Sequence, residues 1–83
     1  MSKLIDDPLK EVEVDRAGRP RSFRWRGGLL RVARTAEVWK DVGCWWEGEG
    51  EKVFYRLETT DGRLLEVYLE RPAGIWRLYR VYD

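Results

Sequence analysis

The chain has 83 residues, of which 43% are hydrophobic, 37% are charged and 13% are aromatic, with a formal net charge of +1. It has room for one small domain with a thin core, and its five tryptophans and four tyrosines exclude a disordered chain. Because it has no histidine and a single cysteine, the sequence excludes a Ser–His–Asp triad, a histidine-ligated metal and an internal disulfide.

The N-terminal segment gives no targeting signal. Residues 1–10 contain Asp6 and Asp7 and have no apolar stretch of the kind that a signal peptide needs. The apolar runs elsewhere are too short to cross a membrane, and the lone Cys44 argues against a disulfide scaffold. We therefore expect one cytoplasmic domain over residues 1–83 that does not associate with membranes, with residues 1–9 as a loose N-terminal arm.

Turn signals divide the chain into short runs rich in Val, Leu, Tyr and Trp. These runs predict six strands: Glu11–Val14, Ser22–Arg26, Leu29–Val38, Val53–Thr59, Leu64–Glu70 and Ile75–Tyr82. Six short strands at this spacing predict an all-β fold, an antiparallel meander that forms a small barrel or half-barrel. Residues 35–42 allow one short helical turn as the alternative, but extended chain is favoured there.

The Gly27-Gly28 pair predicts a tight hairpin with these two glycines at its centre. This register places Phe23, Trp25, Leu30 and Val32 on a core face. It gathers Arg24, Arg26 and Arg31 on the other face, with Arg24 directly opposite Arg31. Like charges in that position repel, so we expect an anion beside this basic face. Candidates are an acidic partner, a nucleic-acid phosphate, or Glu47, Glu49 and Glu51 of the same chain.

Two further turns, centred on Asp61-Gly62 and Pro72-Ala73, predict the faces of the last three strands. The expected core face comprises Phe54, Leu65, Val67, Leu69, Trp76 and Leu78. The opposite face gathers Tyr55, Leu57, Tyr68, Ile75 and Tyr79, with Glu66 and Arg77 among them. Tyrosines with isolated charges are typical of a binding surface. The alternative is that a loop such as residues 41–51 covers this face.

The segment around Gly43 is the other candidate for binding. Trp45 and Trp46 are adjacent, so on an extended chain they point to opposite sides. They form either an aromatic platform for a partner or a core plug with a lid. The glutamates that follow alternate with glycines but match no calcium-binding loop, and no metal or other cofactor is expected. No neighbour of Cys44 supplies a base, so we expect a buried thiol rather than a nucleophile.

Ordered motifs along most of the chain suggest a family. They are Phe23-Arg-Trp-Arg-Gly27, Gly43-Cys-Trp45-Trp46, Tyr55-Arg-Leu and the terminal Trp76-Arg-Leu-Tyr-Arg-Val-Tyr82-Asp83. This pattern resembles a small uncharacterised bacterial domain family, a domain of unknown function. It also resembles the C-terminal segment of the non-catalytic Y-family polymerase homologue of bacterial mutagenesis cassettes. That resemblance implies partners in DNA damage tolerance, such as a RecA-like accessory protein or a polymerase, and no activity of its own.

These observations predict a non-enzymatic interaction module, and the resemblance implies that it acts in DNA damage tolerance by translesion synthesis. Its expected docking surface is formed by Tyr55, Tyr68, Tyr79 and Arg77 with Trp45 and Trp46, and a homodimer through that surface is one possible outcome. The alternative is sequence-independent binding of single-stranded nucleic acid through Arg24, Arg26 and Arg31.

Overall fold

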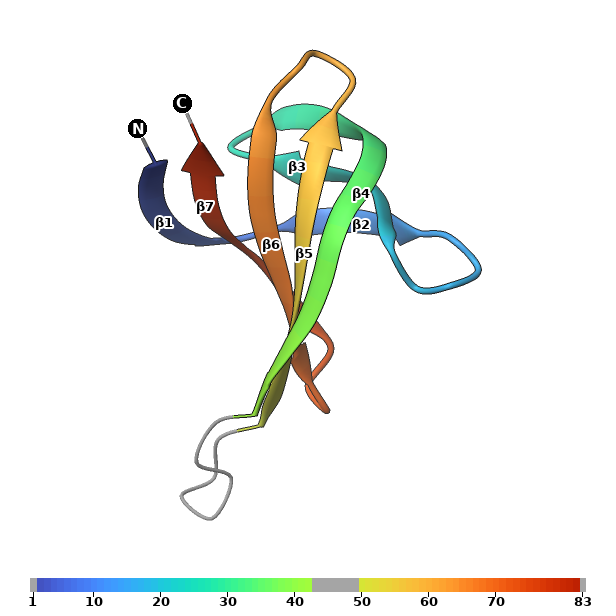
Figure 1. The fold of residues 1–83 in the computed structure, drawn as a ribbon, viewed down its shortest axis with the longest axis vertical. Coiled ribbons are helices and arrows are strands. Elements are labelled where there is room, and N and C mark those ends of the chain that lie inside the picture. The colour runs from blue at the N-terminus through green and yellow to red at the C-terminus, as the bar shows by residue number, and fades with distance from the viewer. Residues whose placement is uncertain (1, 43–49, 83) are drawn as a thin grey trace.

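The computed structural model describes residues 2–42 and 50–82, and this part of the chain contains seven strands and no helix (Figure 1). The strands are β1 (Ser2–Pro8), β2 (Lys10–Val14), β3 (Pro20–Trp25), β4 (Gly28–Val42), β5 (Glu51–Thr59), β6 (Leu64–Arg71) and β7 (Ile75–Tyr82). The predicted all-β fold is confirmed. The prediction that residues 1–9 form a loose N-terminal arm was wrong. Most of this segment is β1, which pairs with β7.

The strands form one antiparallel sheet in the order β1-β7-β6-β5-β4-β3-β2. Its two edge strands, β1 and β2, are consecutive in the chain and are separated only by Leu9. The backbone N–H of Leu9 donates a hydrogen bond to the carbonyl oxygen of Trp76 at 3.0 Å. A flat sheet would hold its edge strands far apart, so this direct link requires the sheet to curl into the half-barrel seen in Figure 1.

Strand β4 is the long strand around which the sheet bends. Its first residues pair with β3, and its residues from Val32 onward pair with β5. The register shifts twice along the β5 side, between Val32 and Arg34 and between Thr35 and Glu37. Such bulges bend a strand and increase its twist. Residues 35–42 are extended throughout, as the sequence favoured, and do not form the alternative helical turn.

The core lies between the two halves of the curled sheet. Its buried members come from β3, β5, β6 and β7: Phe23, Val53, Tyr55, Leu57, Leu65, Val67 and Leu78. Phe23 shares this cluster although β3 is not paired with β5, β6 or β7, so the sheet folds over onto itself. Trp25, Leu30, Val32 and Trp76 pack against the cluster as predicted. Each fully buried large apolar side chain contributes about 1.5–3 kcal/mol to folding.

The predicted pairing of β5 with β6 was wrong by one residue. That pairing requires a two-residue turn at Asp61-Gly62. The backbone N–H of Thr59 instead donates to the carbonyl oxygen of Arg63 at 2.9 Å, which leaves three residues, 60–62, in the loop. Gly62 adopts a positive φ of 86°, as expected for the bulge that ends a three-residue hairpin loop. The slip changes the faces: Tyr55 and Leu57 enter the core, and Phe54 leaves it.

The β3–β4 turn also differs from its prediction. The residues at its centre are Arg26 and Gly27, both with positive φ (51° and 79°), and Gly28 already pairs with Trp25 in the ladder. Each β3 residue pairs with a β4 residue two positions earlier than predicted. Because side chains alternate with a period of two, a shift of two leaves the predicted core face unchanged. The predicted pairing of Arg24 with Arg31 was wrong. Arg24 lies opposite Leu29, and Arg31 lies opposite Ser22.

The pairing of β6 with β7 begins as predicted, with Leu69 opposite Trp76, Tyr68 opposite Arg77 and Val67 opposite Leu78. The register then shifts between Glu66 and Val67, so that Glu66 pairs with Arg80. Tyr79 is the extra residue of this bulge. It lies beside Phe54 and Tyr68, on the face of the sheet that points away from the core.

Candidate interaction surfaces

An aromatic row crosses the outer face of the sheet, with one member from each of β4, β5, β6 and β7: Trp39, Phe54, Tyr68 and Tyr79. Trp39 pairs with Phe54, and Phe54 with Tyr68, in the strand register. The rings of Trp39 and Phe54 are stacked, with centroids 5.4 Å apart and planes inclined by 4°. Tyr79 meets Phe54 and Tyr68 edge-on at 5.3 and 5.8 Å. Such contacts are favourable aromatic geometries, so the row is a packed unit.

The row is buried at its centre and accessible at its ends. Phe54 is 7% exposed and Tyr68 is 4% exposed, whereas Trp39 and Tyr79 are half-buried. A partner approaching this face would therefore meet the two outer rings. The inner rings hold those outer rings in place.

Tyr68 anchors the row to strand β1. Its hydroxyl donates a hydrogen bond to Oδ1 of Asp6 at 2.7 Å, and Nε of Arg77 donates to the same oxygen at 2.9 Å. The hydrogen bond from Tyr68, reinforced by Arg77, holds the pKa of Asp6 below its usual value, against the opposing effect of partial burial. Burial raises the pKa of Tyr68, and the bond to Asp6 adds to that rise. The Arg77 charge is thus already paired.

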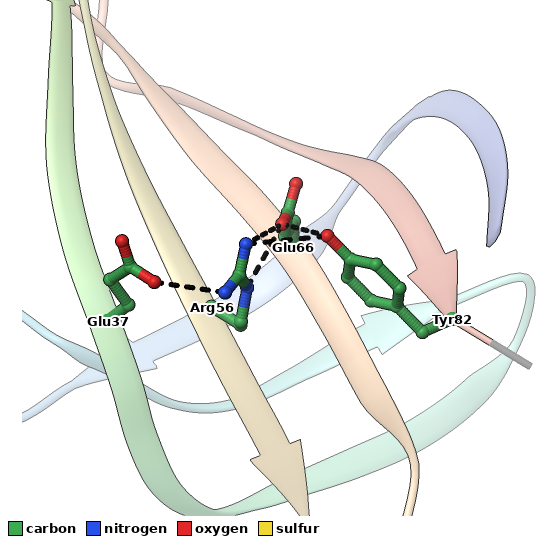
Figure 2. Close-up of polar contacts among 4 residues, drawn as sticks. All are labelled: Glu37, Arg56, Glu66 and Tyr82. Carbon is green, nitrogen blue, oxygen red and sulfur yellow. Dashed lines mark hydrogen bonds and ion pairs between the residues drawn. The ribbon is translucent and has the colours of Figure 1, made fainter.

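A second row lies beside the aromatic one and alternates in charge. This charge row consists of Glu37, Arg56, Glu66 and Arg80, which the register places side by side on β4, β5, β6 and β7. Figure 2 shows Arg56 between two carboxylates: Nη1 donates to Glu37 at 2.9 Å, and Nη2 donates to Glu66 at 3.0 Å. Glu66 is only 3% exposed. A carboxylate is almost never buried to this degree unless a cation pairs with it, as Arg56 does here.

Glu66 is stabilised by convergent donors. Its Oε2 accepts hydrogen bonds from Nε and Nη2 of Arg56, at 3.1 and 3.0 Å, and from the hydroxyl of Tyr82. The hydrogen bond to Glu66 raises the pKa of the Arg56 guanidinium above its usual value. The guanidinium carbon also lies 5.5 Å from the ring centroid of Trp39 and 5.7 Å from that of Tyr82. Arg56 therefore couples the charge row to the exposed end of the aromatic row.

The structure brings together part of the predicted aromatic site. Tyr68, Tyr79 and Arg77 share the outer face, as the sequence predicted. Tyr55 was placed there wrongly: it is 7% exposed and belongs to the core, on the opposite face. Trp45 and Trp46 lie outside the described residues.

Trp39, Phe54 and Arg56 also lie on this face and were not predicted there. The signal that could have found them was the alternation of Glu37, Arg56, Glu66 and Arg80. These four side chains fall into one row only if β5 and β6 pair in the observed register.

The predicted basic face is largely neutralised. Nε of Arg24 pairs with Glu11, and Nε of Arg26 pairs with Asp7 at 2.9 Å. Asp7 also accepts a hydrogen bond from the indole N–H of Trp25 at 3.0 Å, and this bond, with Arg26, lowers the pKa of Asp7. The counter-charges therefore come from β1 and β2 and not from Glu51, which pairs with Lys40 at 3.6 Å. Glu47 and Glu49 lie outside the described residues.

Arg31 differs from its two predicted companions. Within the part of the chain that the structure describes, no acidic side chain forms an ion pair with it. It lies opposite Ser22 and lines a groove at the end of the β3–β4 hairpin.

Residues 2–42 and 50–82 contain no group of three or more Cys, Asp or Glu side chains placed to hold a metal ion. The aspartates whose pKa is shifted, Asp6, Asp7, Asp15 and Asp61, all shift downward because they accept hydrogen bonds. Carboxyls of this kind are ionised at neutral pH and do not act as proton donors.

No helix in these ranges is long and apolar enough to cross a membrane.

Comparison with family models gives a match over the whole chain. The model of a domain of unknown function, DUF6504, matches residues 1–83. The chain belongs to this family. The prediction of an uncharacterised domain family is thereby confirmed. No curated protein and no solved structure matches the chain.

Proposed function

We propose that this DUF6504 domain is a non-enzymatic docking module that binds another protein through the outer face of β4–β7. The observation that carries the proposal is the aromatic row, whose outer rings, Trp39 and Tyr79, are accessible and are fixed by buried neighbours. Aromatic side chains held in one conformation lose little entropy on binding, and they are frequent at the centres of protein interfaces.

The charges around the row favour a protein over a nucleic acid. Arg56 is paired with Glu37 and Glu66, and Arg77 is paired with Asp6. These arginines offer no uncompensated positive charge for phosphates, on which nucleic-acid affinity depends. A neutral face with aromatic anchors and fixed polar groups instead suits a protein partner, whose approach the charge row would orient.

The partner class that we propose is a DNA-damage-tolerance protein, either a RecA-like accessory protein or a polymerase. It is supported by the resemblance of the motifs from Phe23 to Asp83 to the C-terminal segment of the non-catalytic Y-family polymerase homologue. In this role the domain acts in the cytoplasm as an accessory module of translesion synthesis. The alternative of single-stranded nucleic acid bound at Arg24, Arg26 and Arg31 is less well supported, because Glu11 and Asp7 already pair with the first two.

The proposal is tested with purified RecA-like accessory protein and polymerase immobilised for surface plasmon resonance. We expect one of them to bind the wild-type domain, and Trp39→Ala combined with Tyr79→Ala to weaken binding by at least about tenfold. Leu29→Ala is the control, because Leu29 is 47% exposed and lies on the β3–β4 hairpin.

Equal affinity of the double variant and the wild type would overturn the docking face, and no binding to either protein would overturn the partner class. Sedimentation of the free domain at several concentrations shows whether the same face joins two copies instead. That result would replace the proposed partner with a homodimer.

A further inference from the structure

The charge row ends on β7 with Arg80, whose surroundings differ from those of Arg56. Arg56 pairs with a carboxylate on each side, Glu37 and Glu66 (Figure 2). The register places Arg80 opposite Glu66, but no carboxylate of the described residues forms an ion pair with Arg80. Its Nε is enclosed and has no hydrogen-bond partner within residues 2–42 and 50–82. The described part of the chain therefore supplies Arg56 with acceptors and leaves Arg80 short of them.

Two tyrosine rings hold the guanidinium of Arg80 in place. Its carbon lies 5.6 Å from the ring centroid of Tyr79 and 5.8 Å from that of Tyr82. Tyr79 is fixed by its edge-on contacts with the inner rings of the aromatic row, and Tyr82 by the hydrogen bond from its hydroxyl to Glu66. A guanidinium that rests on aromatic rings remains charged and gains attraction from their faces. Arg80 is therefore a preorganised cation that loses little freedom when it binds.

The charge row also has a direction across the sheet. Its two carboxylates and two guanidinium groups sum to zero, but the exposed Glu37 lies at the β4 end and Arg80 at the β7 end. Neighbouring strands lie about 4.8 Å apart, so three spacings separate these ends by about 14 Å along the sheet. At physiological ionic strength salt screens exposed charges beyond about 8 Å. Because Arg56 offsets Glu66, a group bound at the β7 end is attracted chiefly by Arg80.

An exposed leucine adjoins this cation. Leu4 of β1 lies opposite Arg80 in the register and is 61% exposed. Residues directly opposite each other on neighbouring strands carry their side chains on the same face. Leu4 and the half-buried ring of Tyr79 therefore place apolar surface beside the guanidinium. A group that binds here pairs with a charge and buries apolar area in the same contact.

We propose that Arg80 receives a carboxylate of the partner protein, from an acidic residue that has apolar neighbours. This inference rests on the proposed function, since it states what the β7 end of the docking face selects in its partner. Guanidinium groups form strong, oriented hydrogen bonds with carboxylates. A nucleic-acid backbone fits less well, because it requires several cations in succession and gains nothing from the exposed Leu4. Arg80 is in this way the specificity-determining residue at the β7 end.

The test is a nuclear magnetic resonance titration of the full ¹⁵N-labelled chain with two peptides, acetyl-Leu-Glu-Leu-amide and acetyl-Leu-Gln-Leu-amide. The second peptide has the same shape and lacks the carboxylate, and inorganic phosphate is the third probe. Arg80→Gln is compared with Arg34→Gln, which removes the same charge from an arginine that pairs with Glu58 at 3.4 Å. Thermal unfolding shows that both variants are folded. Arg80→Lys, which keeps the charge but lacks the planar fork, replaces Arg80→Gln if the latter does not fold.

We expect the glutamate peptide to shift the Nε–H resonance of Arg80 and the amide resonance of Tyr79. Its dissociation constant should be about fivefold lower than that of the glutamine peptide, because hydrogen bonds to a charged acceptor are stronger. This difference should vanish in Arg80→Gln and persist in Arg34→Gln. Three results would overturn the inference: no shift at Arg80, equal affinity for the two peptides, or tighter binding of phosphate than of the glutamate peptide.

Failure of this inference is distinguishable from failure of the proposed function. The peptides report on Arg80 alone, whereas the variant with Trp39→Ala and Tyr79→Ala reports on the aromatic row in binding to the whole partner. If that double variant binds the partner as tightly as the wild type does, the docking face is wrong whatever the peptides show. If it binds weakly while Arg80→Gln and Arg34→Gln bind the partner equally well, the docking face stands and the role of Arg80 is overturned.

Discussion

Glu66 of β6 lies directly opposite Arg56 of β5, and one oxygen of its carboxylate accepts two hydrogen bonds from that guanidinium, at 3.1 and 3.0 Å. Glu66 is almost fully buried, while Arg56 remains about one-third exposed and also reaches Glu37. A buried carboxylate is costly without such a partner. The pair therefore favours the observed register of β5 and β6 over the alternatives, and with it the composition of the outer face.

Replacing Glu66 tests this relationship. Glu66→Ala leaves the partly buried Arg56 guanidinium and the Tyr82 hydroxyl without their shared acceptor, so we expect a loss of about 1–3 kcal/mol of unfolding free energy. Glu37→Ala removes the other, exposed partner of Arg56 and should cost no more than about 1 kcal/mol. Urea denaturation of both variants measures the difference. Equal losses would show that burial of Glu66 adds nothing to the pair.

The sequence was sufficient to predict the strands from β2 to β7 and the class of fold, because alternating apolar residues and glycine-containing turns carry that information locally. It was not sufficient for β1, whose residues between Leu4 and Pro8 show little alternation and depend on pairing with distant β7. Its bulge, where Asp6 has a φ of 57°, places Asp6 beside Tyr68 and Arg77. The contact of Asp6 with Tyr68 and Arg77 joins residues far apart in the sequence, so no local sequence pattern predicts it.

The candidate site was predicted only in part, for a related reason. Because side chains alternate with a period of two, a one-residue change in the loop after Thr59 moves every side chain of β5 relative to β6. Asp-Gly favours both a two-residue and a three-residue turn. The hydroxyl of Thr59 accepts a hydrogen bond from the N–H of Arg63 at 3.0 Å and so stabilises the longer one. Tyr55 was therefore assigned to the wrong face, whereas Tyr68 and Tyr79 were assigned to the right one.

The assignment of Leu57 to the core is directly testable. Leu57 is fully buried, so Leu57→Ala should cost about 2–5 kcal/mol through lost burial and the cavity left behind. Leu29→Ala makes the same chemical change at a site that is 47% exposed, where an effect within about 0.5 kcal/mol is expected. Thermal and urea unfolding of the two variants would reveal the contrast. A destabilised Leu29 variant beside an unaffected Leu57 variant would contradict the observed faces.

The β3–β4 turn offers a matched pair of glycines. Gly27 has a φ of 79°, so Gly27→Ala places a side chain in a strained backbone conformation and should cost about 1 kcal/mol. Gly28 has no positive φ, and a Cβ there would lie 3.6 Å from the carbonyl oxygen of Trp25, an ordinary contact. We therefore expect Gly28→Ala to change stability little. A turn centred on both glycines would make the two substitutions similarly destabilising, which chemical denaturation distinguishes.

Asp6 predicts a specific sensitivity to acid. Its pKa is lowered in the folded state by the Tyr68 hydroxyl and by Arg77, so the stability that it contributes is fully present above the ordinary value of 3.8 and is lost as the pH falls below it. Asp6→Asn removes this contribution, and asparagine tolerates the positive φ at this position. The gap between the urea midpoints of wild type and variant should be widest near pH 7 and should narrow as the pH falls below the ordinary value of 3.8. A gap that does not change with pH would contradict the role of the ionised carboxylate.

The docking face is tested most directly by nuclear magnetic resonance of the ¹⁵N-labelled domain titrated with the partner that binds it. The proposed function predicts shifts or broadening at the Trp39 indole N–H and at the Tyr79 amide, with the Trp25 indole N–H, held by Asp7, unchanged. Perturbations confined to Trp25, Arg21 and Arg31, with Trp39 and Tyr79 unmoved, would contradict the proposal that the aromatic row is the surface that binds protein.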